Sequence, residues 1–353
     1  MSQSLRIACW NICWFAGLFN QDDALIDDDS RSAVHDVTKQ RQAKAIAHVL
    51  RAVDADLFAI IEAPNDGKRQ STVRALQGFA EMADLRQTRA VIGFPSDTEQ
   101  EIALLYDPDQ ISAWHDPVGD PTPEADELLA VPSVPRFDGV FPLDLDGDGE
   151  ADLHRFSKPP LEAQVHLRGP DKSLRLIAVH AKSKAPHGAK SEAEATRISL
   201  LNRRKQLAQC AWLRGRVDEH LQAGDDLVIL GDFNDGPGLD KYERVFGRSG
   251  VEVVMGDPGR PEALLRNPFT RRQVTRFGAL PSTARFYIRQ TQGYLNALID
   301  FVMLSPRLAA NTAPDWRIWH PFDDAVCFAD DAMREALLDA SDHFPVSVDL
   351  HFG

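Results

Sequence analysis

The stretch that decides how this chain is interpreted is Asp226-Leu227-Val228-Ile229-Leu230-Gly231-Asp232-Phe233-Asn234-Asp235. Four consecutive apolar residues are typical of a buried strand, and oxygen-bearing side chains follow them directly. We expect Gly231 to let the backbone turn sharply, so that Asp232 and Asn234 lie at the strand end, where a ligand can reach them. Taken alone, the motif fits an ordinary acidic turn equally well.

Four more apolar runs lead into a polar side chain in the same way. They are 5–10 before Asn11, 56–61 before Glu62, 174–179 before His180 and 297–299 before Asp300. The last run inverts the order, because Asp342 and His343 precede the apolar residues of 344–350. If that strand runs antiparallel to the others, its start lies beside their ends. The sequence then predicts that these polar groups converge on one edge of a sheet.

The converging groups suit a hard cation and proton transfer. Carbonyl and carboxylate oxygens, with no cysteine among them, favour magnesium, or manganese in its place, over zinc. These oxygens belong to Asn11, Glu62, Asp232, Asn234 and Asp342. His180 and His343 titrate near neutral pH, and Asp300 is able to fix the tautomer of one imidazole. This inventory predicts metal-assisted hydrolysis of a phosphate ester.

These motifs resemble those of the endonuclease/exonuclease/phosphatase superfamily of DNase I-like hydrolases. The resemblance covers nearly the whole chain and rests on segments 10–12, 61–62, 179–180, 231–234, 298–301 and 341–346. It implies a four-layer α/β sandwich, in which helices flank two packed mixed β-sheets. We expect one domain over residues 1–353, with an acidic insert at about 107–157.

The resemblance also implies how the metal is held and how water is activated. Glu62 is expected to be the main magnesium ligand, with Asn11 and Asp342 beside it. His343, paired with Asp300, would be the base that activates water. A histidine or an aspartate at a strand end is often an ordinary surface or turn residue, so these roles depend on the joint pattern.

The remaining matches concern the phosphate. Asp232 and Asn234 would orient the nucleophile and the phosphate. His180 would hydrogen-bond a phosphate oxygen or assist the leaving group. The proton donor to that group stays open between Asp232 and His180.

Two basic segments favour a nucleic acid substrate. Residues 263–299 hold six arginines and no acid, and such a surface would track a polyanion, with Arg289 among its contacts. Aromatic residues of the same segment, Phe286, Tyr287 and Tyr294, would stack on bases or belong to the core. The alternative for the arginines is a solvated loop.

The second basic segment follows His180. The sequence His180-Ala181-Lys182-Ser183-Lys184 is similar to the His-x-Lys-Ser-Lys element of bacterial nuclease-type members of the superfamily. It assigns Lys182 and Lys184 to substrate binding. This element moves the expected substrate toward nucleic acid.

The acidic region contains a candidate calcium loop. Its acids follow the pattern Asp-x-Asp-x-Asp-Gly with a further acid, namely Asp144, Asp146, Asp148 and Asp152. The twelfth position is Arg155 instead of glutamate, and prolines on both sides exclude the flanking helices of an EF-hand. We expect a helix-free structural Ca²⁺ loop, or else an acidic turn without metal.

Charge and composition indicate in which cellular compartment the protein is expected. The net charge is −14, but 97–152 alone holds sixteen acids against one base, so the overall acidity says little about the active face. The chain has no apolar run long enough to span a membrane. Because its first strand begins by Leu5, we expect no secretory signal peptide. Four cysteines show neither a zinc spacing nor a dense disulfide framework. We expect a cytoplasmic protein without membrane association and with no evident obligate protein partner.

Helical segments alternate with the strands. The apolar stripe of 38–53 predicts a helix, and so does the longer segment 192–222, which ends at Gly224. Both helices are expected to pack against a sheet, the second through residues that include Ile198, Leu201 and Trp212.

The sequence therefore predicts a magnesium-dependent nuclease that hydrolyses DNA or RNA by in-line attack of a histidine-activated water. The alternative is a phosphatase or a phospholipase C-like esterase, acting on a small phosphate such as an inositol phosphate or on a sphingolipid, because the same core chemistry permits it. A non-catalytic binding module is the third class, and the intact set of polar residues argues against it.

Overall fold

The computed structural model describes residues 3–120, 134–145, 148–186, 188–237, 247–270, 281–289 and 291–353. The first sheet has the strand order β14 (Asp315–Ile318), β15 (Val346–Phe352), β1 (Gln3–Asn11), β2 (Leu57–Ala63), β4 (Glu101–Tyr106) and β3 (Arg89–Ile92). The second has the order β13 (Asp300–Leu304), β10 (Leu227–Asp232), β9 (Lys172–His180), β8 (Leu161–Leu167) and β5 (Ile111–His115). Both sheets mix parallel and antiparallel pairs.

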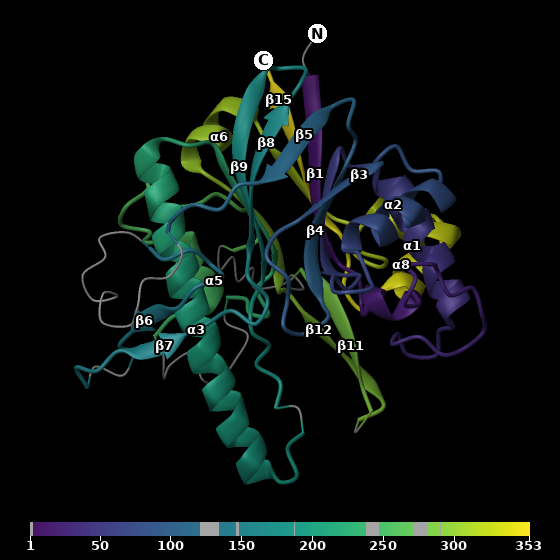
Figure 1. Ribbon diagram of the computed structural model, residues 1–353, viewed down its shortest axis with the longest axis horizontal. Helices are drawn as coiled ribbons and strands as arrows, with labels where there is room; N and C mark the ends of the chain where they lie inside the picture. The colour runs from purple at the N-terminus through teal and green to yellow at the C-terminus, as the bar shows by residue number, and fades with distance from the viewer. Residues whose placement is uncertain are drawn as a thin grey trace.

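Helices cover the outer face of each sheet (Figure 1). The first sheet carries α1 (Lys39–Val53), α2 (Thr72–Met82) and α8 (Asp331–Ala340), whereas the second carries α3 (Glu192–Ala223) and α5 (Gly250–Met255). Shorter elements connect them, namely η1 (Phe15–Leu18), α6 (Pro306–Thr312) and α7 (Ala325–Ala329). Two hairpins stand apart from the sheets, β6 (Phe141–Leu143) with β7 (Asp152–His154) and β11 (Ala284–Ile288) with β12 (Gly293–Ala297). The predicted four-layer α/β sandwich is confirmed.

Three apolar layers hold the sandwich together. Side chains of β1 alternate, so that Ile7 packs between the sheets while Ala8 and Trp10 pack against the helices of the first sheet. Trp212 of α3 packs with Ile229 of β10 in the third layer. Because both faces of each sheet are covered, the central strands are continuous apolar runs rather than alternating ones.

The two predicted helices form, but one packs differently from the expectation. Thr38 caps α1, where its side chain accepts a hydrogen bond from the Arg41 N–H at 3.3 Å, and Gly224 ends α3 in the left-handed conformation. The buried residues of α3 begin only at Gln206. The expectation that Ile198 and Leu201 pack on the sheet is wrong, because the first half of α3 extends past the end of the strands (Figure 1), leaving Leu201 46% exposed.

The acidic stretch 107–157 is not wholly an insert. Its residues 111–115 form β5, which pairs with β8 at the edge of the second sheet. The candidate calcium loop joins β6 to β7, so it lies in a β-hairpin without flanking helices. Within it the Asp144 carboxylate accepts the Gly149 N–H at 3.0 Å. Asp146 lies outside the described residues, and calcium binding stays a prediction.

No helix in the described ranges has both the length and the apolar character needed to cross a membrane.

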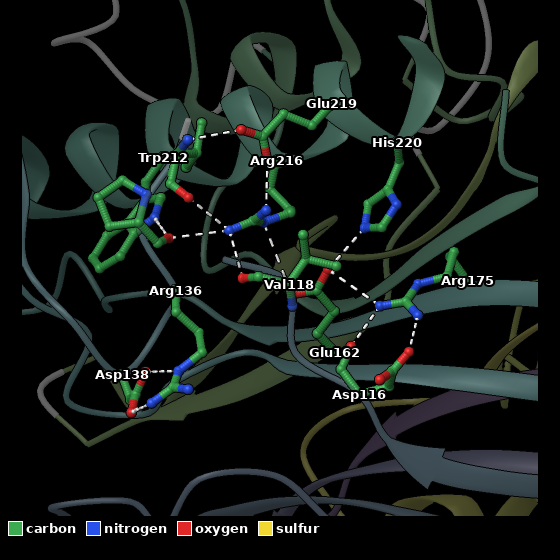
Figure 2. Close-up of polar contacts among 12 residues, drawn as sticks. Asp116, Val118, Arg136, Asp138, Glu162, Arg175, Trp212, Arg216, Glu219 and His220 are labelled. Atoms are coloured by element: carbon green, nitrogen blue, oxygen red, sulfur yellow. Dashed lines mark hydrogen bonds and ion pairs between the residues drawn. The ribbon is translucent and has the colours of Figure 1, made fainter. Parts of the chain in front are cut away.

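A buried network of charges fastens α3 to the outer face of the second sheet (Figure 2). Glu162 of β8 has a fully buried carboxylate that contacts His220 Nε2 at 2.7 Å and Arg216 Nε at 3.8 Å. The Arg216 guanidinium, also fully buried, donates to the carbonyl oxygens of Val118 and Val134 at 2.8 Å each. The helix is therefore held by ionic as well as apolar contacts.

Glu162→Ala should destabilise the fold by roughly 3 kcal/mol or more, because it removes the fully buried carboxylate that Arg175, Arg216 and His220 share. The buried Arg216 then keeps only Glu219 as an acidic partner among the described residues. Asp116→Ala is the matched control, since Asp116 bonds Arg175 from a half-exposed position and its loss should cost about 1 kcal/mol or less. Urea unfolding of both variants measures the difference. Equal losses in the free energy of unfolding would show that Glu162 stabilises the fold no more than Asp116 does.

Candidate active site

The predicted polar groups meet at one end of the sandwich, where the strands β1, β2, β9 and β10 finish. A cleft of about 830 Å³ opens there, and its lining includes Asn11, Glu62, His180, Asp232, Asn234, Asp342 and His343. As expected, β15 runs antiparallel to β1, which brings the residues that precede β15 to this edge. Asp300 lies buried directly behind His343.

Asp300 reaches the site from the opposite direction to the one predicted. Residues 297–299 do not form a strand that ends at Asp300, because β12 ends at Ala297 and Asp300 begins β13. Since β13 runs antiparallel to β10, Asp300 faces Asp232 in the register of the second sheet. The start of β13 and the end of β10 therefore lie at the same edge of the second sheet.

Gly231 is required for a different reason from the expected turn. It lies inside β10 with φ at 132°, and a Cβ at this position would stand 2.1 Å from the carbonyl oxygen of Val179 on β9. The turn comes later, at Asn234, which adopts φ of 51° and donates its N–H to the Asp232 carboxylate at 2.7 Å. The glycine thus lets β9 and β10 approach closely, and His180 pairs with Asp232 in their register.

Glu62 enters the cleft through a β-bulge rather than at a strand end. The register of β2 against β4 shifts between Ile61 and Ala63, and Glu62 adopts a left-handed φ of 62°. Its carboxylate accepts the Trp14 N–H at 2.8 Å. Burial raises the pKa of Glu62, and this N–H offsets part of that effect. A bulge of this kind interrupts the alternation of side chains between the two faces of the sheet and so redirects one side chain.

The groups around Glu62 fit a hard cation. Asn11 Nδ2 donates to the Asp232 carboxylate at 3.0 Å, whereas Asn11 Oδ1 is buried without a hydrogen-bond partner in the described part of the chain. A buried carbonyl oxygen of this kind is costly unless a donor or a cation meets it. Together with the carboxylates of Glu62 and Asp342 in the same cleft, it supplies the oxygen ligands that magnesium prefers.

His343 is held in one orientation. Its Nδ1 lies 2.9 Å from the Asp300 carboxylate, and the ring of Phe286 contacts it edge to face with 5.4 Å between centroids. Burial alone would lower the pKa of His343, but the negative charges of Asp300, Asp232 and Asp342 outweigh it and raise that pKa to about 10. The pair matches the expected arrangement of a base and its orienting acid.

Asp232 is placed to hold a proton near neutral pH. Burial and the charge of Asp300 raise the pKa of Asp232 to about 7, against the hydrogen bonds that it accepts from Asn234 and Asn11. Ligand atoms of Asp232, Asp300 and His343 lie within 4.8 Å of one another, which is also close enough for a cation. Because His343 Nδ1 already bonds Asp300, we interpret these three residues as a proton-transfer set.

His180 is a neutral imidazole at neutral pH. Burial and the positive charges of Lys158, His343 and Lys182 hold its pKa well below the ordinary value. Its Nε2 lies 3.6 Å from the Asp232 carboxylate. A neutral ring in this place suits hydrogen bonding to a phosphate oxygen.

Sequence reasoning missed Lys158. Its ammonium lies 3.3 Å from both ring nitrogens of His180, and the largely buried side chain lines the cleft. The charges of Glu62 and Asp232 act on it, but no carboxylate forms an ion pair with it in the described part of the chain. Lys158 belongs to a Pro-flanked loop before β8 and follows no strand-end pattern, so no local signal marked it.

The predicted substrate residues separate into different places. Lys182 and Lys184 both line the cleft. The ammonium of Lys184 is paired with the buried carboxylate of Asp235. Arg289 lies outside the cleft, beside a second pocket behind the β11–β12 hairpin. Three of the six arginines, at 271, 272 and 276, lie outside the described residues.

Comparison with known proteins decides the family. A model described as the Endonuclease/Exonuclease/phosphatase family matches residues 8–343. The chain belongs to this family. It is thereby a phosphoesterase of a class that depends on a divalent metal.

Solved structures resemble the chain in fold. A family protein from Bacteroides thetaiotaomicron gives a TM-score of 0.52 at 15% identity, covering 100% of this chain and 96% of that one. Truncated TDP2 from Caenorhabditis elegans gives 0.50 at 14% identity, with 99% and 98% covered. No curated protein matches the chain. At these identities the likeness shows the fold alone.

The raised pKa of His343 can be measured in the metal-free protein. Because neighbouring carboxylates stabilise the imidazolium, this histidine should stay protonated at pH 8. Asp300→Asn removes the largest of these charges, so burial should then bring the titration to or below the ordinary value of about 6.5. NMR titration, with His343→Ala to assign the resonance, measures both. An exposed change such as Asp315→Asn should leave the titration unaltered, and an unaltered titration in Asp300→Asn would show that Asp300 is not the cause.

Proposed function

We propose that the protein is a metal-dependent nuclease that cleaves phosphodiester bonds of DNA or RNA. The observation that carries this proposal is the oriented His343–Asp300 pair, which shares one cleft with the oxygen ligands Asn11, Glu62 and Asp342. A base fixed beside a cation site is what hydrolysis of a phosphate ester by water requires.

The residues divide the chemistry between them. His343 Nε2 takes the proton from the attacking water, and Asp300 stabilises the imidazolium that forms. Asn234 orients the phosphate. Asp232, whose pKa is raised to about 7, delivers a proton to the leaving oxygen, whereas the neutral His180 hydrogen-bonds a phosphate oxygen. Lys158 donates to a phosphate oxygen and offsets the charge that develops there.

The cation site is coupled to this proton transfer. Glu62, Asn11 and Asp342 would hold Mg²⁺ or Mn²⁺, which when bound supplies positive charge that stabilises the phosphate oxygens. The surrounding carboxylates raise the pKa of His343, so a protonated ring is favoured while their charges stand uncompensated. Compensation of the Asp342 charge would lower that pKa in part, which favours a ring that accepts a proton.

The surroundings of the cleft favour a polymer. The first half of α3 and the β11–β12 hairpin both extend past the strand ends (Figure 1), and the cleft opens at that end of the sandwich. Lys158 and Lys182 line the cleft, and so do the apolar side chains of Phe286, Ile288 and Leu295. Such a site offers a phosphate both positive charge and apolar surface for the attached nucleoside.

The direct test is cleavage of single- and double-stranded DNA and RNA in magnesium, with and without EDTA, and with His343→Ala as the blank. Bis-p-nitrophenyl phosphate, inositol phosphates and sphingomyelin vesicles serve as comparators. Metal-dependent cleavage of a polymer supports the proposal. Turnover of only a small ester or a lipid would replace it with the phosphatase or phospholipase C-like esterase.

Glu62→Gln should raise the magnesium concentration needed for half-maximal activity by about 100-fold, because an amide oxygen is a weaker ligand than a carboxylate. A metal titration of initial rates measures this shift. Glu81→Gln, an exposed change on α2, is the control and should behave as the unchanged protein. An unshifted metal requirement in Glu62→Gln would remove Glu62 from the cation site.

Lys158→Met should lower kcat by roughly 100-fold, the loss expected when one charge-stabilising donor is removed, with a smaller effect on KM. Lys158→Arg should recover part of the rate because it keeps the charge. The control is Lys190→Met, since Lys190 is exposed and does not line the cleft. A raised KM with unchanged kcat would show that Lys158 only binds the substrate.

A further inference from the structure

The β11–β12 hairpin has two chemically different faces. Tyr287 pairs with Tyr294 and Phe286 with Leu295 in its antiparallel register, and side chains directly opposite each other share a face. Phe286, Ile288 and Leu295 line the catalytic cleft. Arg285, Tyr287, Arg289 and Tyr294 instead line a second pocket of about 460 Å³. The hairpin is therefore a wall between the two cavities.

The base of this wall is fixed to the catalytic residues. The Arg285 N–H donates to the carbonyl oxygen of Asp342 at 2.7 Å, and the Phe344 N–H donates to that of Thr283 at 2.7 Å. The Thr283 hydroxyl accepts the Asp300 N–H at 3.0 Å. Asp342 lines both cavities. The second pocket thus begins at a candidate cation ligand, one residue from His343.

Arg285 presents donors that nothing in the described chain uses. Its guanidinium lies 3.6 Å over the ring of Tyr294 and 5.2 Å from the ring of Phe322. A guanidinium that stacks on a ring keeps its in-plane N–H donors available. Its side chain forms no hydrogen bond or ion pair with the described residues. Arg289, exposed on the same face, is likewise unpaired within these ranges.

Acids in the pocket are already engaged. Asp339 pairs with Arg41 at 2.5 Å, and Asp36 lies 3.6 Å from Arg31. Asp342 belongs to the candidate cation site. The positive charges of Arg285 and Arg289 are therefore left for a ligand.

Aromatic surface completes the pocket. The rings of His35 and Tyr287 lie 3.8 Å apart at 31°, which holds Tyr287 in place. Tyr294 is 51% exposed, so it offers ring surface beyond the part that Arg285 covers. Stacking surface beside unpaired arginines is the combination that single-stranded nucleic acid binds.

We propose that the second pocket binds the nucleotide next to the scissile phosphate of a single-stranded nucleic acid. Arg285 and Arg289 contact its phosphate, and its base stacks on Tyr294. The volume suits a single nucleotide, since it falls in the range of small-ligand sites. A single strand is favoured over a duplex because a base must leave its neighbours to stack on protein. This inference rests on the proposed nuclease function and names its substrate form.

Binding tests the pocket without turnover. Fluorescence anisotropy of a labelled single-stranded oligonucleotide is measured with His343→Ala, alone and combined with Arg285→Ala or Tyr294→Ala. Each combination should weaken binding about tenfold, the lower end of the effect of losing one stacked base. Tyr294→Phe, which keeps the ring, and Arg260→Ala, an exposed arginine outside both cavities, should bind as His343→Ala alone. Unchanged affinity in Arg285→Ala and Tyr294→Ala overturns the proposal, and so does equally tight binding of the matching duplex.

Kinetics separate this inference from the function on which it rests. In an otherwise unchanged enzyme, Arg285→Ala should raise the KM for the oligonucleotide about tenfold more than the KM for bis-p-nitrophenyl phosphate. A wild-type enzyme that turns over the small ester but no polymer refutes the nuclease, and the pocket assignment with it. A wild-type enzyme that cleaves the polymer, beside an Arg285→Ala variant with the same KM for it, refutes the pocket alone.

Discussion

The site depends on hydrogen bonds that cross from one sheet to the other. Asp300 belongs to the second sheet and His343 precedes a strand of the first, and their side chains meet at 2.9 Å. Asn11 of the first sheet likewise reaches Asp232 of the second at 3.0 Å. Because neither sheet carries the complete set, the packing of the two sheets is what brings His343, Asp300 and the oxygen-bearing side chains of the cleft together.

The region where side chains of the two sheets meet holds several charged groups that are buried from solvent. Nearby carboxylates raise the pKa of His343, and burial together with the charge of Asp300 raises the pKa of Asp232. Such an arrangement is costly to fold without compensation. Sites of this kind are where proteins accept local strain, and the left-handed Glu62 and Asn234 lie here as well. A divalent cation of the kind on which the family depends would compensate this charge.

Different elements project on the two sides of the region where the sheets meet. On one side the first half of α3 leaves the sheet, and on the other the β11–β12 hairpin separates the cleft from a second pocket. The phosphoesterase class is that of the family. In the proposed function, the projecting elements select the group that the phosphate carries, and the backbone of Arg285, which hydrogen-bonds Asp342, joins the hairpin to the cleft.

Much of this was accessible from the sequence, because strand periods, helix caps and strand-end polar residues are local signals. The limits of α1 and α3, and the edge at which Asp232, His180 and His343 meet, follow from such signals, whereas the sandwich follows from the family resemblance that these motifs carry. Tertiary structure decided the rest. The bulge at Glu62, the close approach that requires Gly231, and the reversed direction of Asp300 all depend on register between strands. Lys158 reaches His180 from a loop 22 residues away, and the two faces of the hairpin acquire their roles only where it stands between cavities. No local pattern contains these relations, since they arise from long-range packing.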